Sequence, residues 1–310
     1  MQHQTAQQPI FIFGFPRSGT TLLQRLLNSY PDILIWGEHV AFLKDVANAY
    51  FQVWQNPDFF KSPTPLSEVL KETKPLTEWQ GWLNWVGEEE WKQLYRQFLE
   101  SIFVPGGLPG KRFWGWKEVH YTGSNEDQTL PFLANIYPEA KYVFLVRSGF
   151  NTMASFSLWP RRSNIAEWKQ EGCEQWKKMI RSFRDWHRSG RVESFWIRYE
   201  ELITGEGEVL RLLESMGKRL GDDQRAILQA ETGRGSSFGT QSYNERWKKL
   251  STLRLGVALA CFGKLNRELG YDTPRVPIHG RVAGTAVSAL LSWPYFASRL
   301  LRRTQRDLGL

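Results

Sequence analysis

Arg17 is the first side chain whose surroundings suggest chemistry, because it lies in a short turn bounded by Gly14 and Gly19. Two hydroxyl side chains, Thr20 and Thr21, follow the turn directly. Backbone N–H groups in such a turn point inward, and a helix that starts there adds partial positive charge. The turn therefore predicts an anion site. Its expected ligands are Arg17, Ser18, Gly19, Thr20 and Thr21.

The apolar pattern around the turn predicts the elements that position it. Residues 9–13 form an apolar run typical of a buried strand, and a helical pattern of leucines follows the turn. The spacing is that of a phosphate-binding loop, but Thr20 occupies the position of the usual Lys. The best later strand ends in Arg147 and not in an Asp that could hold magnesium. The loop therefore favours an anion on a nucleotide and disfavours ATP with magnesium.

Arg147 follows a second apolar run, Tyr142 to Val146, and Ser155 comes eight residues after it. A planar guanidinium group can hold two phosphate oxygens at once, which a Lys ammonium cannot do. An Arg at the end of a strand can also serve only in a salt bridge. Together with the first turn, however, this pair predicts a second phosphate subsite.

The run from Pro16 to Thr21 and the pair Arg147 and Ser155 resemble the two phosphate motifs of one enzyme family. This family is the sulfotransferases that use 3′-phosphoadenosine-5′-phosphosulfate (PAPS), and the resemblance extends from about Ile10 to Tyr271. It implies an α/β fold with a mostly parallel central sheet and helices on both faces. It also implies transfer of a sulfuryl group from PAPS to a hydroxyl or amine, without a metal and with release of adenosine 3′,5′-bisphosphate. Tyr199 resembles the family's tyrosine near the adenine.

Candidate catalytic residues follow two further apolar runs. Glu38 and His39 come after Ile33 to Ile35, and active groups in open α/β sheets gather beyond the carboxyl ends of strands. Many family members carry the catalytic base here, so we expect Glu38, ahead of His39, to take the acceptor's proton. The alternative is that Glu38 caps the next helix. His120 is the next candidate for the base if both fail.

Lys117 follows a run with two tryptophans, residues 113–116. The resemblance implies a Lys placed on the bridging oxygen of the scissile bond, and with Arg17 it would stabilise the leaving phosphate. The alternative is a surface lysine paired with Glu118. Both alternatives remain open from the sequence.

The chain divides into three parts by composition. We expect a flexible N-terminus at 1–8, a sulfotransferase domain at 9–275 with a helical, Trp-rich insertion at about 40–112, and a basic amphipathic tail at 276–310. The tryptophans suit core packing or the lining of an apolar acceptor pocket equally well. Further along we expect a helix from Trp168 to His187 and a buried strand from Ser194 to Leu202. The run Tyr243 to Lys249 is a candidate for the family's basic loop over the nucleotide, although the Arg-Lys-Gly triplet of its cytosolic branch is absent.

Composition narrows the classes of protein that fit. Hydrophobic residues make up 41% of the 310, so a sizeable core is expected. Two distant cysteines argue for a reducing, cytoplasmic compartment and against a zinc site or disulfide framework. We also expect no signal peptide and no membrane-spanning helix. An apolar segment followed by four arginines makes the tail a candidate for contact with an anionic membrane surface.

Two rival functions remain beside sulfotransfer. A nucleotide or small-molecule kinase would need the missing Lys and a magnesium ligand. A non-enzymatic nucleotide or RNA binder would suit the net charge of +8, but the basic residues are scattered and no RNA-module motif occurs. We therefore expect no nucleic acid partner. An apolar acceptor and a glycan acceptor are both open.

Overall fold

The computed structural model describes residues 7–39, 41–55, 87–124, 126–157, 164–229 and 245–307, with the backbone alone beyond residue 292. Within these ranges five strands form one parallel sheet in the order β2-β3-β1-β4-β5. The strands are β1 (Gln8–Gly14), β2 (Ile33–Trp36), β3 (Phe113–Glu118), β4 (Lys141–Val146) and β5 (Ser194–Arg198). The predicted fold class, a parallel α/β sheet, is therefore confirmed.

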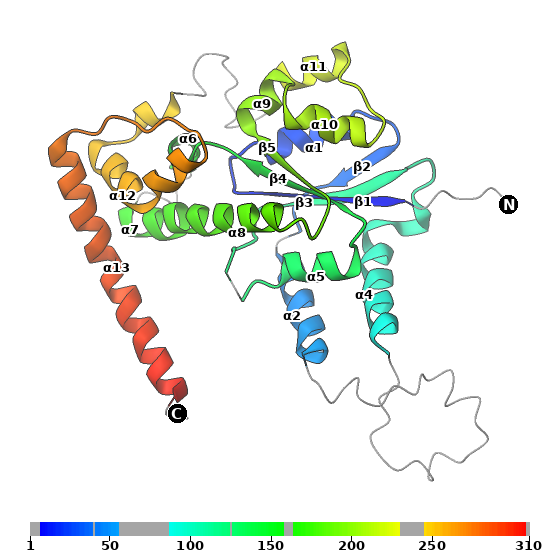
Figure 1. Ribbon diagram of the computed structural model, residues 1–310, viewed down its shortest axis with the longest axis horizontal. Helices are drawn as coiled ribbons and strands as arrows, with labels where there is room; N and C mark the ends of the chain where they lie inside the picture. The colour runs from blue at the N-terminus through cyan, green and yellow to red at the C-terminus, as the bar shows by residue number, and fades with distance from the viewer. Residues whose placement is uncertain are drawn as a thin grey trace, which may run out of the picture.

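Helices cover both faces of the sheet (Figure 1). One face carries α1 (Thr20–Asn28), α9 (Tyr199–Thr204), α10 (Glu208–Ser215) and α11 (Asp222–Gln229). The other carries α2 (Phe42–Trp54), α4 (Glu88–Phe103), α5 (Thr129–Ile136), α6 (Gly149–Phe156), α8 (Gln175–Ser189) and α12 (Thr252–Glu268). Successive side chains of a strand point to opposite faces of the sheet. Ile10 and Ile12 therefore pack against the helices of the first face, and Phe11 and Phe13 pack against those of the other face.

Two predicted elements differ from the structure. The strand expected from Ser194 to Leu202 ends at Arg198, and Tyr199 begins α9. Glu200 and Glu201 lie in the first helical turn, where negative charge stabilises a helix N-terminus. The helix expected from Trp168 to His187 is composite: a short α7 (Ile165–Glu167) leads into a π-helical segment, Trp168–Glu174, and then into α8.

The Trp-rich insertion is described only at its two ends. Residues 56–86, with Trp79, Trp82 and Trp85, lie outside the described residues. Trp54 stacks on Tyr50 with ring centroids 5.3 Å apart and packs against the core. The tryptophans that the structure describes in α2 and α4 therefore serve core packing.

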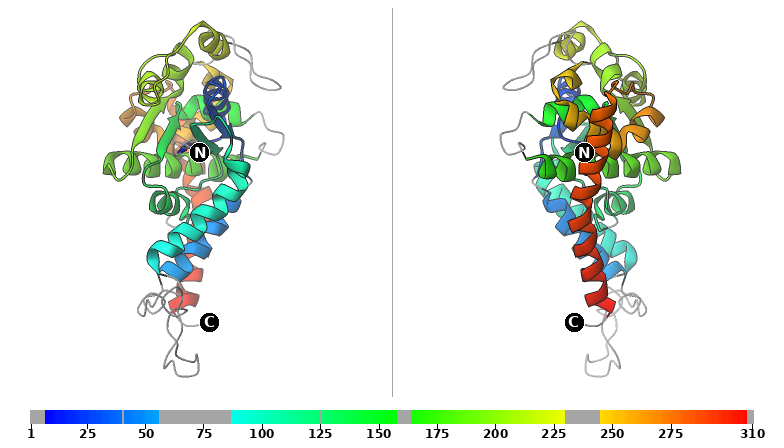
Figure 2. Two further views of the ribbon diagram at one scale, coloured as in Figure 1. Left: turned by 90° about the vertical axis from the view of Figure 1, so that its right-hand side faces the viewer. Right: turned by 90° about the vertical axis from the view of Figure 1, so that its left-hand side faces the viewer.

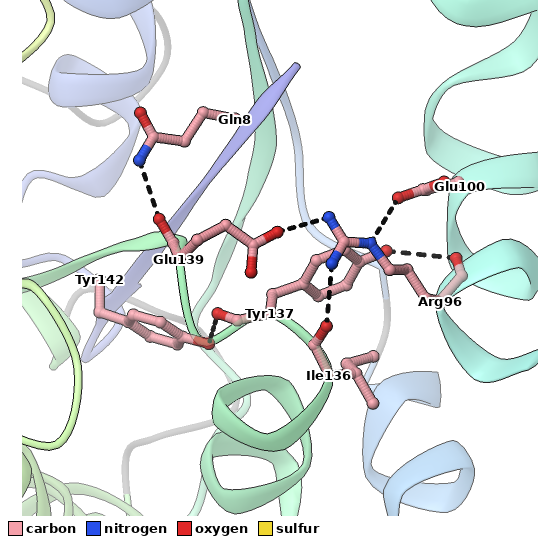
Figure 3. A network of polar contacts seen from close by, with 7 residues as sticks. All are labelled: Gln8, Arg96, Glu100, Ile136, Tyr137, Glu139 and Tyr142. Carbon is pink, nitrogen blue, oxygen red and sulfur yellow. Dashed lines mark hydrogen bonds and ion pairs between the residues drawn. The ribbon is translucent and has the colours of Figure 1, made fainter. Parts of the chain in front are cut away.

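Arg96 fastens the insertion to the sheet (Figure 3). Its guanidinium bonds Glu100 on its own helix, α4, and forms an ion pair with Glu139 in the turn before β4. The backbone carbonyl of Glu139 accepts a hydrogen bond at 2.8 Å from the side-chain amide, Nε2, of Gln8 in β1. This network fixes α4 against the amino end of the central strands.

The predicted tail forms a long helix, α13 (Ile278–Asp307), which runs along one side of the molecule (Figures 1 and 2). It packs on α12 through glycines: a Cβ on Gly256 would lie 2.0 Å from the carbonyl oxygen of Gly280. The two backbones are therefore in direct contact. No helix among the described residues has an apolar stretch long enough to cross a membrane.

Candidate active site

The pairing register brings the predicted motifs together at the carboxyl edge of the sheet. Gly14 of β1 pairs with Leu145 of β4, so the turn after Gly14 lies beside Arg147. In the same way the pair Val146 and Arg198 brings Tyr199 beside Arg147. On the other side, Trp36 of β2 pairs with Trp116 of β3, which places Glu38 beside Lys117.

The glycines of the first turn are required by close packing. Gly19 caps α1 with a φ of 102°, and a Cβ there would lie 2.5 Å from the ring of Tyr199. Ser18 braces the turn, because its N–H and its hydroxyl both donate to the carbonyl of Phe15. The backbone of Arg17 is also left-handed, with a φ of 72°. Such strain in a residue other than glycine is common at functional sites.

Two predicted arginines meet in one wall of the site. Arg17 Nε donates to Ser155 Oγ at 3.1 Å, and Arg147 donates to the carbonyl of Arg17 at 3.1 Å. The guanidinium of Arg147 lies 4.3 Å from the ring centroid of Tyr199. Burial lowers the pKa of both Arg17 and Arg147, and the positive charge of Arg246 lowers each further. A group of cations of this kind, in which Arg147 and Arg246 are buried and Arg17 is half-buried, suits an anion of high charge.

Arg246 is a site residue that the sequence did not single out. It is buried in a short 3₁₀ segment, Arg246–Lys249, and lines the same cavity as Arg17 and Arg147. The backbone N–H of Trp247 donates to Asn151 Oδ1 at 3.2 Å, which ties this segment to α6. The segment lies in the candidate basic loop, but the sequence has three cations there, and nothing in their spacing distinguishes Arg246.

Lys117 is buried and contacts Glu38, from the neighbouring strand, and Thr21, from the first helix. Its Nζ lies 2.5 Å from Glu38 Oε1 and 3.1 Å from Thr21 Oγ1. The alternative of a surface lysine paired with Glu118 is wrong. Glu118 instead accepts from the N–H of His120 at 2.6 Å, and burial raises the pKa of its carboxyl.

The structure separates the two candidate bases. Glu38 lines the cavity, and its carboxylate is partly exposed. His120 lines the same cavity with a partly exposed imidazole. The imidazole of His39 packs 4.4 Å from the ring of Phe103, where burial lowers its pKa. His39 is not among the described residues that line the cavity.

The cavity that these residues line has a volume of about 440 Å³. One group of its residues comes from the phosphate loop and the ends of β4 and β5, with Arg246. A second group comes from the segment after β3, from the π-helical segment and from α8, and two phenylalanines from elsewhere, Phe15 and Phe156, complete it. The members from the three segments are Val119, His120, Tyr121, Thr122, Glu171, Gln175 and Met179. The described residues contain no cluster of three or more potential metal ligands, and the metal-free reaction stays a prediction.

A sequence profile of the sulfotransferase family matches residues 9–221, which is more than half of the chain. The chain therefore belongs to the sulfotransferase family. The protein-tyrosine sulfotransferases 1 of Danio rerio and Homo sapiens are each 28% identical to it over 175 residues. The match covers 52% of this chain and only 41% and 40% of those two proteins, so the chain spans less than half of their length.

Among solved structures, the sulfotransferase domain of the Synechococcus PCC 7002 olefin synthase is similar in fold. The TM-score is 0.51 at 17% sequence identity, over 88% of this chain and 98% of that one. This likeness agrees with the fold, and the match to the family model confirms the predicted family. The family implies PAPS as the donor.

Proposed function

We propose that this protein transfers the sulfuryl group of PAPS to a hydroxyl or amine of an acceptor. The observation that carries the proposal is the convergence of Arg17, Arg147 and Arg246 in the wall of one cavity. Arg17 and the backbone amides of the phosphate loop would bind the 5′-phosphosulfate. Arg147 and Ser155 would bind the 3′-phosphate, and Tyr199 would lie against the adenosine.

Glu38 and Lys117 supply the two charges that sulfuryl transfer uses. The carboxylate of Glu38 would take the proton of the acceptor as its oxygen or nitrogen bonds to sulfur. The bond between sulfur and the bridging oxygen of the donor breaks, and its electron pair stays on the released phosphate. Lys117, held between Thr21 and Glu38, would stabilise that developing negative charge.

Ligand-induced shifts in melting temperature separate this function from the two rivals. We expect adenosine 3′,5′-bisphosphate to stabilise the protein by about 2.7 kcal/mol at a concentration of 100 times its dissociation constant. ATP with magnesium and a single-stranded RNA should stabilise it less at equal concentration, because Thr20 replaces the loop Lys and the cations converge in one pocket. A larger shift with ATP–magnesium would favour a kinase, and a larger shift with RNA would favour a binding protein.

We also propose that the protein is cytoplasmic and that its C-terminal tail contacts an anionic membrane surface. The described part of α13 exposes Ile278, Val282 and Leu290, and Leu290 is 71% exposed. Four arginines follow in the sequence, at positions 299, 302, 303 and 306. Exposed apolar side chains that are followed in the sequence by a cationic run favour peripheral binding to anionic lipid.

We expect the full chain to sediment with vesicles that contain phosphatidylserine and to stay in solution with neutral vesicles. Replacing Arg302, Arg303 and Arg306 by Glu should abolish the binding to anionic vesicles. A truncation at Pro277 is a poorer test, because it would uncover the face of α12 that Gly280 and Gly284 contact. If the full chain and the variant with the three Glu replacements sediment equally with anionic vesicles, the proposed contact between the arginines and the membrane is contradicted.

A further inference from the structure

Glu200 is a charged side chain that lies beside the nucleotide residues but outside the cavity. It follows Tyr199 in the first turn of α9, and the pairing of Val146 with Arg198 brings this turn to the end of β4. Glu200 is half-buried and is not among the described residues that line the cavity. A ligand in the cavity would therefore reach Arg147 from one side, while Glu200 lies on another.

Tyr271, which follows α12, holds the carboxylate of Glu200 in place. The hydroxyl of Tyr271 donates to Glu200 Oε2 at 3.2 Å. The same hydroxyl lies 3.4 Å from the backbone carbonyl oxygen of Val146, at the end of β4. The ring of Tyr271 is buried, and the guanidinium of Arg198 lies 4.4 Å from its centroid. Glu200 is thereby fixed close to the backbone that carries Arg147.

The carboxylate of Glu200 and the guanidinium of Arg147 attract each other. Burial raises the pKa of the Glu200 carboxyl, whereas the charge of Arg147, the hydrogen bond from Tyr271 and the charge of Arg198 all lower it. Burial lowers the pKa of Arg147, and the negative charge of Glu200 acts against that shift. A phosphate that binds Arg147 from the cavity must therefore share this cation with Glu200, and the two anions repel each other.

We propose that Glu200 competes with the 3′-phosphate of the nucleotide for Arg147 and so speeds the release of adenosine 3′,5′-bisphosphate. This inference rests on the proposed function, which assigns the 3′-phosphate to Arg147. Glu200 acts through Arg147 and is therefore a positioning residue. The 3′-phosphate takes no part in the making or breaking of bonds. Weaker binding there speeds release of the product without weakening the contacts to the transferred group.

Replacing Glu200 by Gln tests the inference by the sign of the change. Gln can still accept the hydrogen bond from Tyr271, but it carries no charge. We expect the affinity for adenosine 3′,5′-bisphosphate to rise by about fivefold at low salt, the upper range for one exposed charge pair, and its dissociation rate to fall by a similar factor. Added salt should narrow the difference. Adenosine 5′-phosphate should gain about twofold or less, because it lacks the 3′-phosphate. Isothermal titration and stopped-flow displacement measure these changes.

Three further variants separate the charge of Glu200 from its place in the fold. Glu201→Gln is the matched control and should leave both affinities unchanged, because it removes a carboxylate from the same helical turn that lies beside Gly207. Tyr271→Phe removes a hydrogen bond that stabilises the charged form of Glu200, so nucleotide affinity should rise again, but less. In an Arg147→Ala chain, Glu200→Gln should lose most of its effect, because a carboxyl without its cation takes up a proton.

The pH dependence gives an independent measure of the same charge. The difference between the wild type and Glu200→Gln should be largest in alkaline buffer. It should shrink as the pH falls, because the wild-type carboxyl, whose pKa burial raises, takes up a proton and loses its charge. A difference that stays constant with pH would contradict a role for the charge of Glu200.

The sign of the affinity change decides between competition and a merely structural role. Weaker or unchanged binding of adenosine 3′,5′-bisphosphate in Glu200→Gln overturns the inference, because loss of a structural contact does not tighten binding. Should this variant fail to fold, weaker binding in Tyr271→Phe overturns it in the same way. An equal gain for both nucleotides removes the link to the 3′-phosphate. If the wild type does not bind adenosine 3′,5′-bisphosphate at all, the proposed function itself is contradicted.

Discussion

Replacing Glu38 by Gln should lower turnover by about 10²–10⁴-fold, the range expected for loss of a general base, and leave the affinity for adenosine 3′,5′-bisphosphate nearly unchanged. Gln keeps the shape of the side chain and can still accept a hydrogen bond from Lys117, so the contact at Oε1 is preserved. It cannot take up a proton. The loss therefore appears in the transition state and not in the nucleotide complex.

His39→Ala is the first control for this experiment. The His39 ring packs on Phe103 and the cavity lies elsewhere, so we expect a modest loss of stability and little loss of turnover in the folded fraction. His120→Gln is the second control, because His120 lines the same cavity and bonds Glu118. Near-normal turnover in Glu38→Gln, with a large loss in His120→Gln, would move the role of base to His120.

Replacing Arg147 by Ala should weaken adenosine 3′,5′-bisphosphate by about 10²-fold or more, the usual cost of truncating one partner of a buried charge pair. Adenosine 5′-phosphate, which lacks the 3′-phosphate, should lose far less. The physical reason is position: Arg147 is 4% exposed and lies between the phosphate loop and the ring of Tyr199. Isothermal titration with both nucleotides measures the two losses.

Two variants give this titration its controls. Arg147→Lys keeps the charge without the planar, two-pronged geometry and should fall between wild type and Ala. Arg198→Ala removes an arginine from the adjacent strand end, where it lies over the ring of Tyr271 and does not line the cavity. It should leave both affinities unchanged. Equal losses for both nucleotides in Arg147→Ala would remove the assignment of Arg147 to the 3′-phosphate.

The phosphate side of the site could be predicted from the sequence because each motif is local. A strand, a turn and a helix follow one another within residues 9–28, and Arg147 and Ser155 are joined by a single helix. The fold class follows from the resemblance that these motifs carry, and the pattern of buried runs agrees with it. Side-chain periodicity marks which segments are buried, and buried strands joined by helices form parallel sheets.

Contacts between distant segments could not be predicted in the same way. Lys117 and Glu38 are 79 residues apart, and their contact depends on β3 lying between β1 and β2. Strand order and register leave no mark in either local sequence, so the pairing of Lys117 with Glu118 was an equal alternative. Arg246 was missed for a similar reason, since its place beside Arg147 depends on how Trp247 docks on α6.

The π-helical segment Trp168–Glu174 allows the lining of the cavity to change in a way that substitution of a side chain does not. A π-helical turn contains about one residue more than an α-helical turn. Deleting one residue would therefore let the segment close as ordinary α-helix, without breaking the chain. Because α8 is fixed by buried side chains such as Trp176 and Ile180, the rotation would fall on the residues before it. Glu171 would turn by about 100° around the helix axis, so a change in helix length alone would present a different side chain to the cavity.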